Sequence, residues 1–203
     1  MAVRAVVFDI GGVLEVTPDL GMHQKWLAQL GLPEPEYRNR TDEIWRAGSI
    51  GGLSLAQVHD QLAYALNVDA GTVDALMDDH WTEYLGTPNT DLVEYARSLR
   101  PRYRTGILSN SFVGAREKEQ QAYGFEDLVD VIVYSHEVGF AKPDRRVYKL
   151  TCDRLGLPAG ETAFIDDVEA NVDGARAYGI RAVRYKDNTQ VIADVEALLA
   201  KES

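Results

Sequence analysis

Cysteine is almost absent from this sequence. Cys152 is the only cysteine among 203 residues, so an intrachain disulfide is excluded. Nothing near it in the sequence marks it as a reactive thiol, and it falls in a segment with helical spacing. We therefore expect Cys152 to be an inert packing residue, in a protein of the reducing cytoplasm.

Long apolar runs and clusters of basic residues are missing as well. No stretch reaches the roughly 18 apolar residues of a membrane-spanning helix, and residues 1–4 lead into a strand-like segment rather than a signal peptide. The formal net charge is −11. This excess of negative charge argues against a nucleic-acid or membrane partner. A hydrophobic content of 45% allows a sizeable core.

Short apolar strands alternate with helices from residue 88 onward. Strands are expected at residues 3–9, 103–108, 130–134, 162–165 and 180–185, and helices at 91–99, 113–123, 145–155, 168–178 and 189–199. Such alternation is typical of a parallel sheet covered on both faces. The sequence therefore predicts an α/β fold with a Rossmann-like parallel sheet.

Residues 17–86 differ, because they contain no strand-like run. Four helical segments fit, at residues 20–30, 36–47, 54–66 and 70–85. Ser54 is a suitable N-cap and Asn67 a suitable stop for the third segment. We expect residues 17–86 to form an all-helical insertion, and residues 1–16 and 87–203 to form the α/β domain.

Polar residues follow four of the expected strands. Asp9, Ser109 and the pair Asp166–Asp167 each come at the end of an apolar run, and Lys142 lies in the loop after another. Because ligands bind at the carboxyl ends of parallel strands, these residues should meet at one sheet edge. Adjacent carboxylates repel unless a cation or a donor neutralises them. An acid nucleophile, a hydroxyl, a lysine and an acid pair suit phosphoryl transfer.

Four segments resemble the motifs of the haloacid dehalogenase superfamily of aspartate-nucleophile hydrolases, in that superfamily's order. They are Phe8-Asp9-Ile10-Gly11-Gly12-Val13-Leu14, Leu108-Ser109-Asn110, Lys142-Pro143-Asp144, and Asp166-Asp167 with Asn171-Val172-Asp173-Gly174-Ala175. The resemblance spans the chain, and residues 17–86 lie where that superfamily inserts a helical cap. The Gly-Gly-Val-Leu form of the first motif is similar to a subgroup with sugar-phosphate phosphatases and the amino-terminal domain of soluble epoxide hydrolases.

The resemblance implies a role for each of these residues. Asp9 would attack phosphorus and form an aspartyl-phosphate that water hydrolyses, with Ser109 and Lys142 as further catalytic residues. The substrate, a small phosphorylated metabolite such as a sugar phosphate, would be bound by Gly12, Ser109, Asn110 and Lys142. The expected cofactor is Mg²⁺, held by Asp9, Asp166, Asp167 and the carbonyl oxygen of Gly11. A monomer and a homodimer both stay open.

Gly11 departs from the superfamily pattern, which usually has an aspartate there as general acid and base. Two alternatives to a phosphatase therefore remain: a catalytically weak regulatory or binding member, and a 2-haloacid dehalogenase-type hydrolase. The superfamily's dehalogenases need no metal and have serines where this chain has Asp166 and Asp167, which favours a metal-dependent phosphatase. Glu15 is the nearest replacement acid in the sequence.

The helical insertion offers no clear substrate contact. Its tryptophans, Trp26, Trp45 and Trp81, are expected in helical core stripes, and Arg38, Arg40 and Arg46 on a solvated helix face. The four histidines show no metal-ligand spacing. Substrate specificity would lie on cap residues that helical periodicity does not identify.

Overall fold

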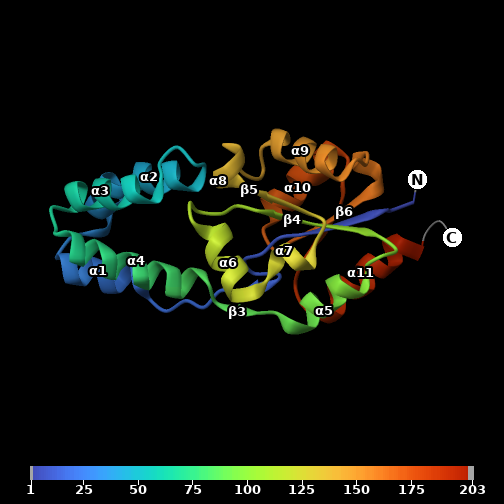
Figure 1. The fold of residues 1–203 in the computed structure, drawn as a ribbon, viewed down its shortest axis with the longest axis horizontal. Helices are drawn as coiled ribbons and strands as arrows, with labels where there is room; N and C mark the ends of the chain where they lie inside the picture. Colours follow the sequence, from blue (N-terminus) through green and yellow to red (C-terminus); the bar gives the residue numbers. More distant parts are fainter. Residues whose placement is uncertain (1, 201–203) are drawn as a thin grey trace.

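The computed structural model describes residues 2–200 and shows one parallel sheet at the centre of the α/β part (Figure 1). Its strands are β1 (Ala5–Phe8), β4 (Arg104–Ser109), β5 (Val131–Tyr134), β6 (Thr162–Asp166) and β7 (Arg181–Arg184). The strand order is β5-β4-β1-β6-β7. Phe8 is paired with Ile107 of β4 and Ile165 of β6, so these three strands end side by side.

Helices cover both faces of the sheet (Figure 1). The side chains of β1 alternate between the two faces. Val6 and Phe8 belong to the apolar cluster under α5 (Thr90–Ser98), α7 (Phe125–Leu128) and α11 (Asn188–Ala200). Ala5 and Val7 belong to the cluster under α9 (Arg145–Leu155) and α10 (Glu169–Tyr178). All four strand residues are buried, as a strand covered on both faces requires. The predicted α/β class is confirmed.

Four helices lie together at one end of the molecule (Figure 1). They are α1 (Met22–Leu30), α2 (Glu34–Ser49), α3 (Leu55–Leu66) and α4 (Ala70–Tyr84). Their shared apolar cluster includes Trp26 and Trp81, and it also takes in Phe112 from the loop after β4. Ser54 forms a capping box at the start of α3, and Asn67 ends that helix with a φ of 56°. None of the helices described is both long and apolar enough to cross a membrane.

The sequence did not predict several short elements. Two strands, β2 (Glu15–Val16) and β3 (Thr87–Pro88), pair antiparallel where the chain enters and leaves the four-helix part. Two residues are too few to show alternation, so such a ribbon has no sequence signal. The short helices α8 (Ser135–Val138) and η1 (Ala159–Glu161) were also missed, whereas α6 (Ala115–Tyr123) falls within the expected segment.

Candidate active site

Three carboxylates converge at the carboxyl edge of the sheet. Asp9 directly follows β1, and Asp166 and Asp167 lie at the end of the neighbouring strand β6. One oxygen atom from each residue lies within 4.8 Å of the others. Asp9 and Asp166 are buried, and Asp167 is half-buried. The β1–β6 pairing therefore brings together acids that are more than 150 residues apart in the sequence.

Lys142 lies between two of these acids. Its Nζ is 2.7 Å from Oδ1 of Asp9 and 2.6 Å from Oδ2 of Asp166, and the lysine side chain is completely buried. Asn110 fixes the lysine backbone, since Oδ1 of Asn110 accepts from the Lys142 N–H at 2.7 Å and its Nδ2 donates to the Lys142 carbonyl at 3.0 Å. The loop after β4 thus holds the lysine in place.

Asp166 and Asp167 have different surroundings. Asp166 accepts from Lys142, from the Val168 N–H at 2.8 Å and from Nδ2 of Asn171 at 3.1 Å. Asp167 instead lines a cavity of about 550 Å³, which we call the catalytic cavity because predicted catalytic residues line it. Asp166 is therefore well satisfied by protein donors, whereas Asp167 faces the space where a ligand would bind.

Burial opposes the ionised forms of Asp9 and Asp167. It raises the pKa of Asp9 to about 7, against the attraction of Lys142 and together with the repulsion of Asp166. The pKa of Asp167 is also raised, by burial and by the charge of Asp166. A divalent cation among the three would favour their ionised forms, and Mg²⁺ prefers oxygen ligands of this kind. The residues present therefore fit the expected cation.

Most of the predicted site residues line one cavity of about 550 Å³. They are Asp9, Gly11, Gly12, Asn110, Lys142 and Asp167. Ser109 is not among the residues lining it. Its buried side chain instead faces a smaller neighbouring cavity of about 90 Å³, which Gly11 and Asn110 also line. Asp166 does not line the larger cavity either. The two cavities adjoin, since Gly11, Thr17 and Asn110 line both.

The two glycines of the first motif differ in the space beside them. Gly12 has a φ of 73°, and a Cβ added there would lie 2.5 Å from Oδ2 of Asp167. Glycine is required at this position for both reasons. A Cβ on Gly11 would meet only Oγ1 of Thr17 at 3.7 Å and Oε2 of Glu15 at 4.0 Å. Residue 11 therefore has room for a side chain that this chain does not have.

Glu15, the replacement acid suggested by the sequence, lies next to this open position. It is 1% exposed, and its Oε2 accepts a 2.6 Å hydrogen bond from Oγ1 of Thr17. Burial raises the pKa of Glu15 to about 6, against the hydrogen bond from Thr17. Glu15 lines the smaller cavity but not the catalytic one, whereas Thr17 lines both.

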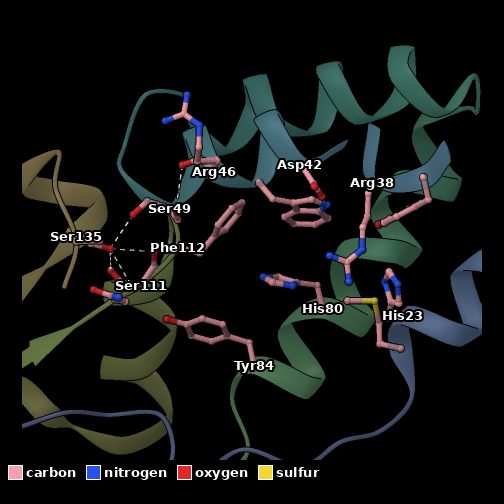
Figure 2. A pocket seen from close by; sticks show the side chains of 15 residues that line it. His23, Arg38, Asp42, Arg46, Ser49, His80, Tyr84, Ser111, Phe112 and Ser135 are labelled. Carbon is pink, nitrogen blue, oxygen red and sulfur yellow. Dashed lines mark hydrogen bonds between the residues drawn. The ribbon is translucent and has the colours of Figure 1, made fainter. Parts of the chain in front are cut away.

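A further cavity of about 540 Å³ lies between the four-helix part and the loops after β4 and β5 (Figure 2). Asn110 lines both this cavity and the catalytic one. Aromatic rings form much of its wall: the ring of His80 lies 5.0 Å from Trp45, 5.3 Å from Phe112 and 5.8 Å from Tyr84 between centroids. Flat apolar groups can stack against such a wall.

Arg38 and Arg46 lie on a solvent-exposed face of α2, as expected, and they also line this cavity. Trp45 also lines it and is only partly buried in the core cluster, unlike Trp26 and Trp81. The sequence contained one usable signal, because Arg38, Asp42 and Arg46 recur at every fourth residue on one face of α2. Periodicity identifies such a face, but only the packing of α2 against the core shows that a cavity lies under it.

Hydrogen bonds tie the end of α2 to the core beside this cavity (Figure 2). The Ser135 hydroxyl donates to the Ser49 carbonyl at 2.7 Å and accepts from the Ser111 N–H at 2.8 Å. The segments that directly follow β4 and β5 therefore hold the end of α2 against the core.

A family comparison agrees with this geometry. The family described as haloacid dehalogenase-like hydrolase matches residues 3–179. The chain belongs to this family. The resemblance found in the sequence motifs is thus confirmed, and the protein is a hydrolase with a relative that is named as a phosphatase. That relative, phosphatase MT3486 of Mycobacterium tuberculosis (strain CDC 1551 / Oshkosh), is 32% identical over 196 residues, covering 90% of this chain and 87% of the relative.

Solved structures share the fold of this haloacid dehalogenase-like hydrolase. HAD family enzyme bt-2542 of Bacteroides thetaiotaomicron has a TM-score of 0.82 at 22% identity, covering 95% of this chain and 99% of that one. The same enzyme was solved in complex with magnesium and inorganic phosphate. A 2-haloacid dehalogenase of Pseudomonas syringae pv. Tomato DC3000 has a TM-score of 0.70 at 18% identity, covering 99% and 100% of the two chains. The fold is therefore common to phosphate-binding and dehalogenating enzymes.

Proposed function

We propose that this hydrolase is a Mg²⁺-dependent phosphatase acting on a small phosphorylated metabolite through an aspartyl-phosphate intermediate. The observation that carries the proposal is the buried Lys142 between Asp9 and Asp166, with Asp167 on the same cavity. A lysine in this position can neutralise an anionic phosphoryl group beside a carboxylate nucleophile. The phosphatase relative supports the same reaction class.

Asp9 is the proposed nucleophile. Its Oδ1 accepts from the Ile10 N–H at 2.8 Å and pairs with Lys142, which leaves Oδ2 as the attacking atom. A bond forms between Oδ2 and phosphorus while the bond from phosphorus to the leaving oxygen breaks, and the electron pair goes to that oxygen. Water then attacks phosphorus and releases the Asp9 carboxylate. Lys142 offsets the negative charge in both steps.

The metal site would be formed by Asp9, Asp167 and the carbonyl oxygen of Gly11. Mg²⁺ bound there would reduce the repulsion between the nucleophile and the phosphate. The sequence also placed Asp166 among the ligands, but its contacts favour a different contribution: it holds Lys142 and Asn171 in position. The magnesium complex of bt-2542 supports the choice of cation.

We propose residues 17–86 as a cap domain and residues 1–16 with 87–203 as the core domain. The 540 Å³ cavity between them would accept the leaving group, because it adjoins the catalytic cavity at Asn110. Its aromatic wall and its two arginines suit a leaving group with a flat face and polar substituents.

The test is phosphate release from a panel of phosphorylated metabolites and aryl phosphates, with Mg²⁺ and with a chelator. Mg²⁺-dependent release by the wild type, absent in Asp9→Asn, is the expected result. A 2-haloacid incubated in parallel separates the alternative, since a dehalogenase would release halide without Mg²⁺. Tight phosphate binding with no turnover of any ester would instead indicate a regulatory or binding member.

A further inference from the structure

The second step of the proposed reaction needs a group that orients the attacking water. Several polar side chains on the catalytic cavity are already engaged. Lys142 pairs with Asp9, Asn110 donates to the Lys142 carbonyl, and Asn171 donates to Asp166. The hydroxyl of Tyr185 donates to Asn188 at 2.9 Å. These contacts hold the site together, so another group must direct the water.

Thr17 has the geometry for this task. Its hydroxyl donates to Oε2 of Glu15 at 2.6 Å, and the lone pairs of Oγ1 are then acceptors. It lines the catalytic cavity together with Asp9. Its Oγ1 would lie 3.7 Å from a Cβ on Gly11, so the hydroxyl stands beside the space that the missing side chain leaves open, two residues after the nucleophile.

Glu15 holds the Thr17 hydroxyl in place by accepting its hydrogen bond. It belongs to β2, is 1% exposed and fits closely beside Gly86, where a Cβ would lie 1.6 Å from Oε1 of Glu15. That Oε1 is buried and has no hydrogen-bond partner within residues 2–200. A buried carboxylate oxygen of this kind calls for a water molecule. The 90 Å³ cavity that Glu15 lines has room for one, since a water occupies about 30 Å³.

We propose, on the basis of the proposed function, that Thr17 is the water-positioning residue and that Glu15 holds it in place. The water donates a hydrogen bond to Oγ1 of Thr17 while its oxygen attacks phosphorus, and this first proton stays on the attacking oxygen. Its second proton passes to a phosphoryl oxygen. The bond between phosphorus and Oδ2 of Asp9 breaks, and its electron pair returns to the carboxylate. Products are inorganic phosphate and free Asp9.

Rapid mixing with p-nitrophenyl phosphate and Mg²⁺ tests the role of Thr17, because nitrophenol reports the first step and phosphate the second. Thr17→Val should keep the first step and slow the second about 10- to 100-fold, so that a nitrophenol burst and phosphorylated Asp9 accumulate. Thr17→Ser should retain most of the second step. Thr72→Val is the matched control, because the Thr72 hydroxyl also donates to a carboxylate, Asp69 at 2.8 Å, but lines neither cavity.

Variants of Glu15 separate positioning from proton transfer. Glu15→Leu should reproduce the loss seen in Thr17→Val. Glu15→Gln should restore most of the second step, since its amide oxygen still accepts from Thr17. A loss in Glu15→Gln as large as in Glu15→Leu would overturn positioning in favour of proton transfer. An unchanged second step in Thr17→Val would also overturn the inference, while a wild type that releases no phosphate would remove the proposed function with it.

Discussion

Asp166 and Lys142 form an ion pair in which both side chains are completely buried, with 2.6 Å between Oδ2 and Nζ. Asp166→Ala should therefore lower the free energy of unfolding by about 3–5 kcal/mol, because it leaves a buried lysine with one partner fewer. Urea denaturation measures this change. Asp173→Ala is the control: it removes an exposed acid from the same motif, whose pair with Arg176 is at the surface, and should change stability little. Equal effects of the two variants would contradict the structural role of Asp166.

Asp9→Asn should abolish turnover without unfolding the protein. The substitution removes the nucleophile and also removes a buried charge that Asp166 repels. The free energy of unfolding should stay the same or rise, since Lys142 keeps its pair with Asp166 and the amide oxygen of an asparagine, unlike an alanine, can still accept from the lysine. Phosphate release and denaturation, measured on one preparation, check both parts. Full activity in purified Asp9→Asn would exclude the proposed mechanism.

Asp167→Ala should lose Mg²⁺ binding together with activity. Asp167 lines the catalytic cavity, whereas Asp166 is engaged by donors of the protein. Calorimetry with Mg²⁺ and beryllium fluoride, a phosphoryl mimic, measures the loss. Unchanged binding in Asp167→Ala would move the metal ligand to another residue.

Gly11 should make the rate depend steeply on the leaving group. No acid stands at this position to protonate a departing alkoxide, so aryl, acyl and anomeric phosphates should react faster than primary alkyl esters. A plot of log rate against leaving-group pKa should have a steep negative slope. A flat slope would show that another group supplies the proton.

Gly11→Asp should then speed the hydrolysis of alkyl esters above all others. The space beside Gly11 accepts a Cβ without close contacts. Gly12→Ala is the contrasting variant, because its φ is positive and its Cβ would press on Asp167. It should lose activity towards every ester. Equal losses in both variants would mean that position 11 is not open.

Glu119 should make stability depend on pH. It is 1% exposed and accepts from the Tyr134 hydroxyl, and burial raises its pKa from the ordinary 4.5 to about 7. The folded state favours the neutral form of Glu119. The contribution of this residue to the free energy of unfolding is therefore complete below about pH 4.5 and is lost as the pH rises through 7. The full effect corresponds to roughly 3 kcal/mol.

Glu119→Gln isolates this contribution. The variant should match the wild type near pH 4.5 and be more stable at pH 8, where the wild type must bury a charge. Thermal unfolding across this pH range measures the difference. Glu117→Gln, an exposed residue of the same helix, should give a curve parallel to the wild type. A parallel curve for Glu119→Gln as well would contradict the raised pKa.

The regular elements of the core could be predicted because their residues are buried in repeating patterns. Residues 5–8 and 163–165 are continuous apolar runs, which strands covered on both faces require. Asp9 and Asp167 could be located for the same reason, since they follow these runs. The β2–β3 ribbon could not be predicted, because its two-residue strands depend on contact between segments that are more than 70 residues apart.

The sequence by itself determined the family, the parallel sheet and the acids and lysine at its edge, because those features are written in local patterns of polarity and in short motifs. Only the tertiary structure decided which groups share a cavity. It placed Ser109 on the smaller cavity that adjoins the catalytic one, paired Asp166 with Lys142, and brought the Thr17 hydroxyl onto Glu15 beside Gly11. Local sequence does not specify these contacts, because they depend on how strands and loops that are far apart in the chain pack together.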